Sequence, residues 1–105
     1  MKLKPVFLNF TDDEGKKTKT FTTCSLKTGM VDNIFDLAER ADKLESESID
    51  IKDVRSFYAD LKSLILGVFK YQFSFDELNE NVEQEELMKV FTDICNNING
   101  EIKKN

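Results

Sequence analysis

The chain of 105 residues is 40% hydrophobic and 33% charged, and it carries a net charge of −5. A disordered chain would be poorer in hydrophobic residues, so this composition predicts one folded domain over residues 1–105. No apolar run approaches the roughly 20 residues that a membrane span requires, and we expect no membrane partner.

Charge is distributed unevenly along the chain. Residues 1–27 hold six lysines against three acidic residues, whereas residues 28–105 hold nine basic against seventeen acidic residues. Because an acidic body repels phosphate backbones, we expect no nucleic-acid partner. Cys24 and Cys95 are far apart in the sequence and form no Cys-x-x-Cys pair, which predicts reduced thiols in a cytosolic protein.

Two strands and a turn are predicted at the N-terminus. The apolar segment 2–10 and the threonine-rich segment 16–23 have the composition of strands, and Asp12, Asp13 and Gly15 favour a turn between them. Pro5 lacks the N–H group of a ladder residue, which places the first strand at an edge. A lone hairpin is only marginally stable, so it should pack on the helices that follow.

Two long helices are predicted next. Apolar residues recur at three- and four-residue steps from Thr28 to Ser46, which is the pattern of an amphipathic helix. Asp50 is placed to cap a second helix, which ends near Lys70 and should be the central helix of the fold. The apolar face of this second helix comprises Val54, Phe57, Tyr58, Leu61, Leu64, Ile65 and Val68.

A short helix and a last long helix complete the expected elements. Ser74 and Glu77 form a capping box for the short helix. Asn81 and Gln84 form a similar box for the last helix, and Gly100 is a suitable C-cap. The buried stripe of the last helix is predicted to comprise Leu87, Val90, Phe91, Ile94 and Ile98.

These elements predict an α+β fold in a single domain. An N-terminal β-hairpin packs on a small bundle of three main α-helices plus one short helix. Residues 1–27 hold the hairpin and a connector, residues 28–100 the helical body, and residues 101–105 a frayed tail.

The segment FKYQFSF, residues 69–75, places four aromatic rings at strict alternation. One interpretation is that Phe69, Phe73 and Phe75 fill the core. The other is that Tyr71 is partly exposed as part of a patch that binds a partner. For such a patch the candidate partner-binding residues are Tyr71, Phe73 and Phe75.

No pattern of residues points to catalysis. The chain has no histidine, which is the commonest general base and metal ligand, and its four glycines stand alone, so no phosphate-binding loop is present. The acidic groups within 12–14 and 83–86 fit a hairpin tip and a helix start better than a cation site. Cys95 has no base beside it and fits a small core residue. We therefore expect no enzymatic activity, no cofactor and no bound metal.

Three segments stand out together: VDNIFDLAERADKL, DIKDVRSFYADLKSLILGVFKYQFSFDELNENV and ELMKVFTDICNNINGEI. They resemble the tail assembly chaperones of long-tailed phages and prophages of low-GC Gram-positive bacteria. The resemblance covers residues of about 28–102, with the hairpin in the expected place before them. The aromatic F-x-F-D-E-L turn after the long central helix is similar to the family's usual form.

The resemblance implies a non-enzymatic role in the host cytoplasm. Such chaperones bind the long, helical tape measure protein, keep it soluble, help gather tail tube subunits around it, and are absent from the finished virion. In many of these phages, programmed frameshifting adds an extension that contacts the tube protein, and this chain would be the short form. The last residues, Lys103-Lys104-Asn105, are compatible with a slippery codon run. The resemblance leaves open which face meets the client and whether the chain self-associates.

Two other interpretations stay open. The chain could be a small cytosolic adaptor or regulatory domain that binds a helix in a groove, without any connection to phages. It could also be an enzyme subunit without chemistry of its own, although an enzyme would show a deep polar pocket. A long tape measure gene directly downstream would distinguish the chaperone from the adaptor.

Overall fold

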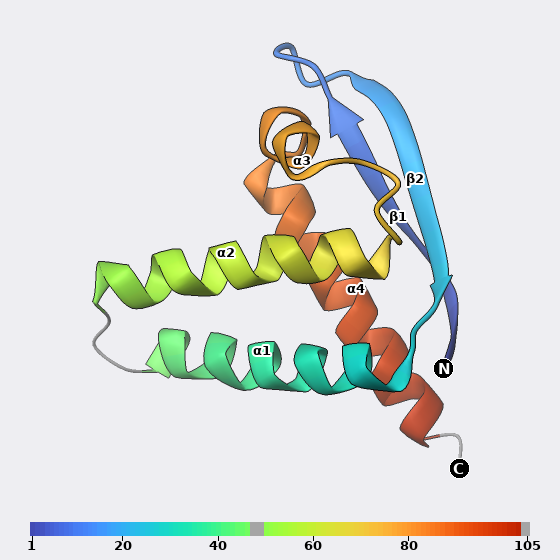
Figure 1. Ribbon diagram of the computed structural model, residues 1–105, viewed down its shortest axis with the longest axis vertical. Helices are drawn as coiled ribbons and strands as arrows, with labels where there is room; N and C mark the ends of the chain where they lie inside the picture. Colours follow the sequence, from blue (N-terminus) through green and yellow to red (C-terminus); the bar gives the residue numbers. More distant parts are fainter. Residues whose placement is uncertain (47–49, 104–105) are drawn as a thin grey trace.

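The computed structural model describes residues 1–46 and 50–103 as a β-hairpin followed by four helices (Figure 1). The strands β1 (Lys2–Thr11) and β2 (Lys17–Ser25) pair antiparallel. The predicted α+β fold, a hairpin with three main helices and one short helix, is confirmed. The helices are α1 (Thr28–Ser46), α2 (Ile51–Val68), α3 (Phe75–Asn81) and α4 (Gln84–Lys103).

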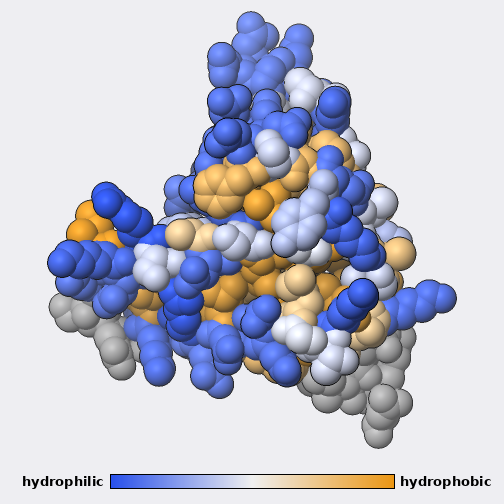
Figure 2. Space-filling model, in the orientation of Figure 1, coloured by the Kyte–Doolittle hydropathy of each residue, from blue (hydrophilic) through white to orange (hydrophobic). Residues whose placement is uncertain are grey.

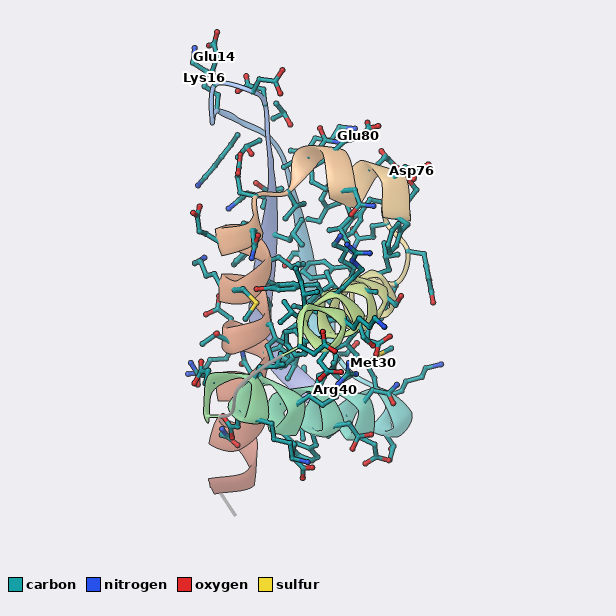
Figure 3. The ribbon with its side chains drawn as sticks, turned by 90° about the vertical axis from the view of Figure 1, so that its left-hand side faces the viewer. Glu14, Lys16, Met30, Arg40, Asp76 and Glu80 are labelled. Carbon is teal, nitrogen blue, oxygen red and sulfur yellow. The ribbon has the colours of Figure 1, made fainter. Side chains whose placement is uncertain are left out.

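One aspartate holds the turn of the hairpin. Oδ1 of Asp12 accepts hydrogen bonds from the backbone N–H groups of Glu14 and Lys16, both at 2.9 Å. Gly15 has a φ of 84°, which a residue without Cβ adopts at no steric cost. The predicted turn chemistry of Asp12 and Gly15 is therefore confirmed. This turn projects beyond the helices, as the labels of Glu14 and Lys16 in Figure 3 show.

The core lies where the hairpin meets the helices. α2 runs between α1 and α3, while α4 crosses behind α2 and packs along β1 (Figure 1). Leu61 and Ile65 of α2, with Val90 and Ile94 of α4, are fully excluded from solvent. Apart from Val54, the apolar face predicted for the second helix and the stripe predicted for the last helix therefore point into one core, and α2 is central as expected.

Side chains of α4 close the outer edge of β1. The backbone N–H of Asn9 donates to Oε2 of Glu86 at 2.8 Å, and the N–H of Lys4 donates to Oδ1 of Asn97 at 3.0 Å. Pro5 lies in the irregular part of the strand register and has no N–H to satisfy there. Glu86, predicted only as a charge at a helix start, thus also serves as an acceptor for a strand edge.

Two predictions about the last helix are wrong. Asn81 does not cap α4, because it ends α3, where its Nδ2 donates to the carbonyl oxygen of Glu77 at 2.9 Å. Gln84 begins α4, and its Nε2 donates to Oη of Tyr58 at 2.9 Å instead of closing a capping box. Gly100 does not end the helix, because it lacks the positive φ of a glycine C-cap. The expected boundary at residue 100 therefore lies inside α4, and residues 104–105 of the expected tail lie outside the described residues.

Candidate functional site

Residues 70–74 connect α2 to α3 in a tight turn, here called the elbow. α2 ends in a Schellman motif, in which the N–H of Tyr71 donates to the carbonyl of Leu66 at 2.9 Å and the N–H of Lys70 to that of Gly67 at 3.0 Å. The closing position of this motif favours glycine, yet Lys70 (φ 57°) and Tyr71 (φ 59°) both adopt the left-handed conformation. Each such residue costs roughly 1–2 kcal/mol, so the surrounding structure must hold the elbow in place.

An aromatic cluster anchors both ends of the elbow. Phe69 and Phe73 are 0% and 4% exposed. The ring centre of Phe73 lies 4.9 Å from that of Phe21, 5.4 Å from that of Phe10 and 5.8 Å from that of Phe69. Tilted and edge-to-face ring pairs stabilise by about 0.5–1.5 kcal/mol beyond the burial of their area. The cluster therefore joins the elbow to both strands of the hairpin.

Hydrogen bonds that join β2 to α2 and to the elbow add to this anchoring. They run from Nζ of Lys70 to Oγ of Ser25 (2.7 Å), from Nε2 of Gln72 to the carbonyl of Thr22 (2.9 Å), and from Oγ1 of Thr23 to the carbonyl of Val68 (2.8 Å). The last of these bonds is buried, where an unpaired carbonyl would be costly. Residues on either side of Tyr71 are thus tied to the sheet, and the backbone between them has little freedom.

The four alternating rings of residues 69–75 divide between the core and the surface. Tyr71 is 74% exposed, and Phe75, the first residue of α3, is 41% exposed with Nζ of Lys62 5.9 Å from its ring centre. The core interpretation is confirmed for Phe69 and Phe73 but not for Phe75. Of the three candidate partner-binding residues, Phe73 offers no surface, whereas Tyr71 and Phe75 are accessible. Their role in binding stays a prediction.

A groove of about 390 Å³ runs between α1 and α2 and is bordered by Tyr71. Its apolar lining comes from Met30 and Leu37 of α1 and from Leu64 of α2. Gly67 leaves room for the methionine, because a Cβ at that position would lie only 2.7 Å from Cε of Met30. We call this hollow the α1–α2 groove.

Polar groups frame the α1–α2 groove. Arg40 of α1 forms a 2.7 Å ion pair with Asp60 of α2, and both side chains line the groove. Figure 3 shows Met30 and Arg40 between the ribbons of these two helices. In Figure 2, apolar residues gather between α3 and α2 and again between α2 and α1, within a hydrophilic surround. The elbow and the groove therefore form one face on which apolar side chains are within reach of a partner.

The cysteine thiols and the possible metal ligands give less support for a functional site. Cys24 and Cys95 are both free thiols, and Cys24 is exposed. Burial raises the pKa of the Cys95 thiol, so less of the nucleophilic thiolate is present at that residue. In residues 1–46 and 50–103, His, Cys, Asp and Glu side chains form no group of three or more that could hold a metal ion. None of the helices in the described part of the chain combines the length and apolar character needed to cross a bilayer.

The hairpin, the helices and the apolar elbow define a small α+β protein that presents an apolar surface on a charged body. The family model described as "Phage tail chaperone protein" matches residues 1–105, and the chain therefore belongs to this family of phage tail chaperones. Neither the curated proteins nor the solved structures compared with the chain contain a match. Membership in this family argues against the adaptor without any connection to phages.

Proposed function

We propose that this chain binds the tape measure protein of its phage in the host cytoplasm, keeps it soluble before the tail is built, and leaves before the virion is complete. A tape measure protein that is long and helical exposes apolar stripes until it is surrounded by tube subunits. A holdase for such a client needs accessible apolar surface on a body that stays soluble through its charge. The proposed role is one of binding, without catalysis.

The exposure of Tyr71 beside the α1–α2 groove is the observation that carries this proposal. The elbow contains two residues in strained backbone conformations, and one of them, Tyr71, is 74% exposed. Backbone strain that persists in a fold is often associated with function. Tyrosine is also enriched at protein interfaces, because its ring is apolar and its hydroxyl group forms hydrogen bonds. A client helix in the groove would contact Met30, Leu64 and Tyr71 together.

Recruitment of tail tube subunits is the second part of the proposed role. It would depend on a longer form of the protein, made by a minus-one frameshift over the codons for Lys103-Lys104-Asn105. The nucleotide sequence from codon 100 onward tests this directly. A slippery heptamer with an overlapping minus-one frame supports recruitment through a longer form, and codons that cannot slip contradict it.

Co-expression with the tape measure protein of the same phage tests the holdase role. The measured quantity is the fraction of tape measure protein that stays in the supernatant after centrifugation, with and without the chaperone. We expect the wild-type chain to raise this fraction several-fold. Tyr71→Ser, and Ser63→Trp, which fills the α1–α2 groove, should both lose most of the effect.

A matched control separates the site from general apolar surface. Phe35 of α1 is 41% exposed and does not line the groove, so Phe35→Ser should keep the full effect. Thermal midpoints of Tyr71→Ser and Phe35→Ser should stay within about 2 °C of wild type, because both rings are exposed. If the wild-type chain does not solubilise the tape measure protein, the function is wrong. If Tyr71→Ser and Ser63→Trp both solubilise it as well as wild type does, the function stands and the site is wrong.

A further inference from the structure

The two outer edges of the β-hairpin form different hydrogen bonds with the rest of the fold. At the outer edge of β1, the N–H of Asn9 donates to a carboxylate oxygen of Glu86 and the N–H of Lys4 to the amide oxygen of Asn97. At the outer edge of β2, Nε2 of Gln72 reaches the carbonyl of Thr22. The sheet has two strands, so each strand has such an outer edge.

The antiparallel register shows which backbone groups of β2 point outward. Asn9 pairs with Thr20, and Phe7 pairs with Thr22. Because the N–H of Asn9 points away from β2, this pair is of the kind that exchanges no hydrogen bonds, and the N–H and carbonyl of Thr20 also point away from the ladder. Thr22, two residues further, repeats this orientation, as the bond from Gln72 to its carbonyl requires.

The part of β2 nearest the hairpin turn is exposed. All side chains from Lys17 to Thr20 are exposed, and Figure 1 shows β2 at the outer margin of the molecule. In the described part of the chain, no hydrogen bond from another element reaches the outward backbone groups of Thr20. An unpaired edge of this kind is a template for the addition of another strand.

Charge selects among the strands that could be added. β2 contains Lys17 and Lys19 and no acidic residue, and Lys16 precedes it. A second copy would bring another such basic strand against the first, which electrostatic repulsion disfavours. An acidic segment would instead place carboxylates beside these lysines. The opposite edge offers a parallel within the same fold, where Glu86 supplies a carboxylate to the N–H of Asn9.

We propose that the outer edge of β2 from Lys17 to Thr22 is a docking site for an extended, acidic segment of a partner protein. The segment adds as a third strand and forms backbone hydrogen bonds with Thr20 and with the N–H of Thr22. Its carboxylates are attracted by the positive charge that Lys17 and Lys19 bring to this edge, where the register shifts by one residue between the two lysines. The edge lies on the hairpin, apart from the α1–α2 groove, so the chain can hold such a segment and a helix at the same time. This binding does not depend on the proposed holdase function.

Titration of the full-length, ¹⁵N-labelled chain with short peptides tests this proposal. The probe is a blocked hexapeptide of alternating glutamate and valine, and the matched control has lysine in place of glutamate. We expect the acidic peptide to shift the amide resonances of residues 17–22 and to slow hydrogen exchange at Thr20. The lysine peptide should bind at least about tenfold more weakly. N-methylation of alternate amides in the acidic peptide should also weaken binding several-fold, because the peptide N–H that donates to the carbonyl of Thr20 is lost and the methyl groups keep the strands apart.

Variants of the chain supply the complementary test. Thr20→Pro removes an outward N–H without removing a ladder bond to β1, so the hairpin should fold while peptide binding is lost. Thr20→Ala keeps the N–H and should bind as wild type does. Lys17→Glu with Lys19→Glu should reverse the preference between the two peptides, and this result does not depend on how proline is tolerated.

Several outcomes would overturn the docking site. Equal binding of the N-methylated and parent peptides would mean that charge attracts the peptide without strand addition. Equal binding of the glutamate and lysine peptides would remove the charge selection. Concentration-dependent shifts at residues 17–22 without peptide would assign the edge to a second copy of the chain. If the acidic peptide shifts no amide resonance of residues 17–22 at millimolar concentration, the edge does not bind an acidic strand.

Discussion

The backbone N–H of Asn9 in β1 donates a 2.8 Å hydrogen bond to Oε2 of Glu86 in the first turn of α4. The bond is partly buried, and it joins residues 77 positions apart in the sequence. The carboxylate of Glu86 accepts this hydrogen bond from the edge of β1, and its negative charge also neutralises the positive end of the α4 dipole. The contact between the hairpin and α4 therefore has a polar component as well as an apolar one.

Loss of this acceptor should destabilise the fold. Glu86→Ala leaves the N–H of Asn9 without its partner, and we expect the free energy of unfolding to fall by about 1–2 kcal/mol. Urea denaturation followed by circular dichroism measures the change. Glu86→Gln keeps an acceptor oxygen and should lose less. Glu85→Ala, at the exposed neighbouring position, should change stability by no more than about 0.5 kcal/mol, and an equal loss at both positions would contradict the role of Glu86.

The backbone strain in the elbow can be measured by substitutions at Lys70. Lys70→Ala removes the bond from Nζ to Ser25 and keeps a side chain at positive φ. Lys70→Gly removes the same bond and also relieves the left-handed conformation, so it should be more stable than Lys70→Ala by about 1 kcal/mol. Thermal or urea unfolding of the two variants gives this difference directly. A glycine variant no more stable than the alanine variant would mean that the elbow carries no strain at this residue.

Gly67 and Met30 should be energetically coupled. Alanine at position 67 favours the helix by up to about 1 kcal/mol, but its Cβ would lie 2.7 Å from Cε of Met30. The methionine end is flexible and can move into the α1–α2 groove, so Gly67→Ala alone should be close to neutral. In a Met30→Ala background the same change should stabilise by about 0.5–1 kcal/mol. A double-mutant cycle with these variants measures the coupling. If the changes in the free energy of unfolding are additive, the side chain of Met30 moves aside without an energetic penalty.

The two thiols should differ in reactivity. Cys24 is exposed, whereas Cys95 is partly buried and burial raises its pKa, so a smaller fraction of it is thiolate at any given pH. At pH 8 a chromogenic aromatic disulfide should label Cys24 roughly ten times faster than Cys95. The rate at Cys95 should also continue to rise above pH 8.5, the ordinary thiol pKa. Single Cys24→Ser and Cys95→Ser variants isolate each rate, and equal rates would contradict the burial of Cys95.

The local elements of the fold could be predicted because local chemistry dictates them. The bounds of α1 follow from apolar residues at helical spacing, and the start of α3 follows from Ser74 and Glu77, which form both bonds of a capping box. Both signals act over a few residues, so neighbours in sequence are enough to read them. Asn81 shows the limit of this approach, because an asparagine can end one helix as readily as it caps the next.

The candidate site depended on contacts between distant segments. Alternation in the segment 69–75 indicated that not all four rings could be buried, but it could not assign them. Phe73 is buried because Phe10 and Phe21, more than fifty residues earlier in the chain, supply its ring contacts. Tyr71 is exposed because the Schellman motif at the end of α2 turns it outward, and no glycine marks that turn in the sequence.

By itself the sequence determined the elements of this chain, their apolar faces and its resemblance to tail chaperones, because periodicity, capping and family pattern are all local or linear properties. Only the tertiary structure decided which aromatic rings face solvent, which edge of the hairpin α4 closes, and where a groove lies between α1 and α2. Each of these depends on two segments that are far apart in the sequence and meet only when the core packs. The surfaces proposed for binding are therefore properties of that packing.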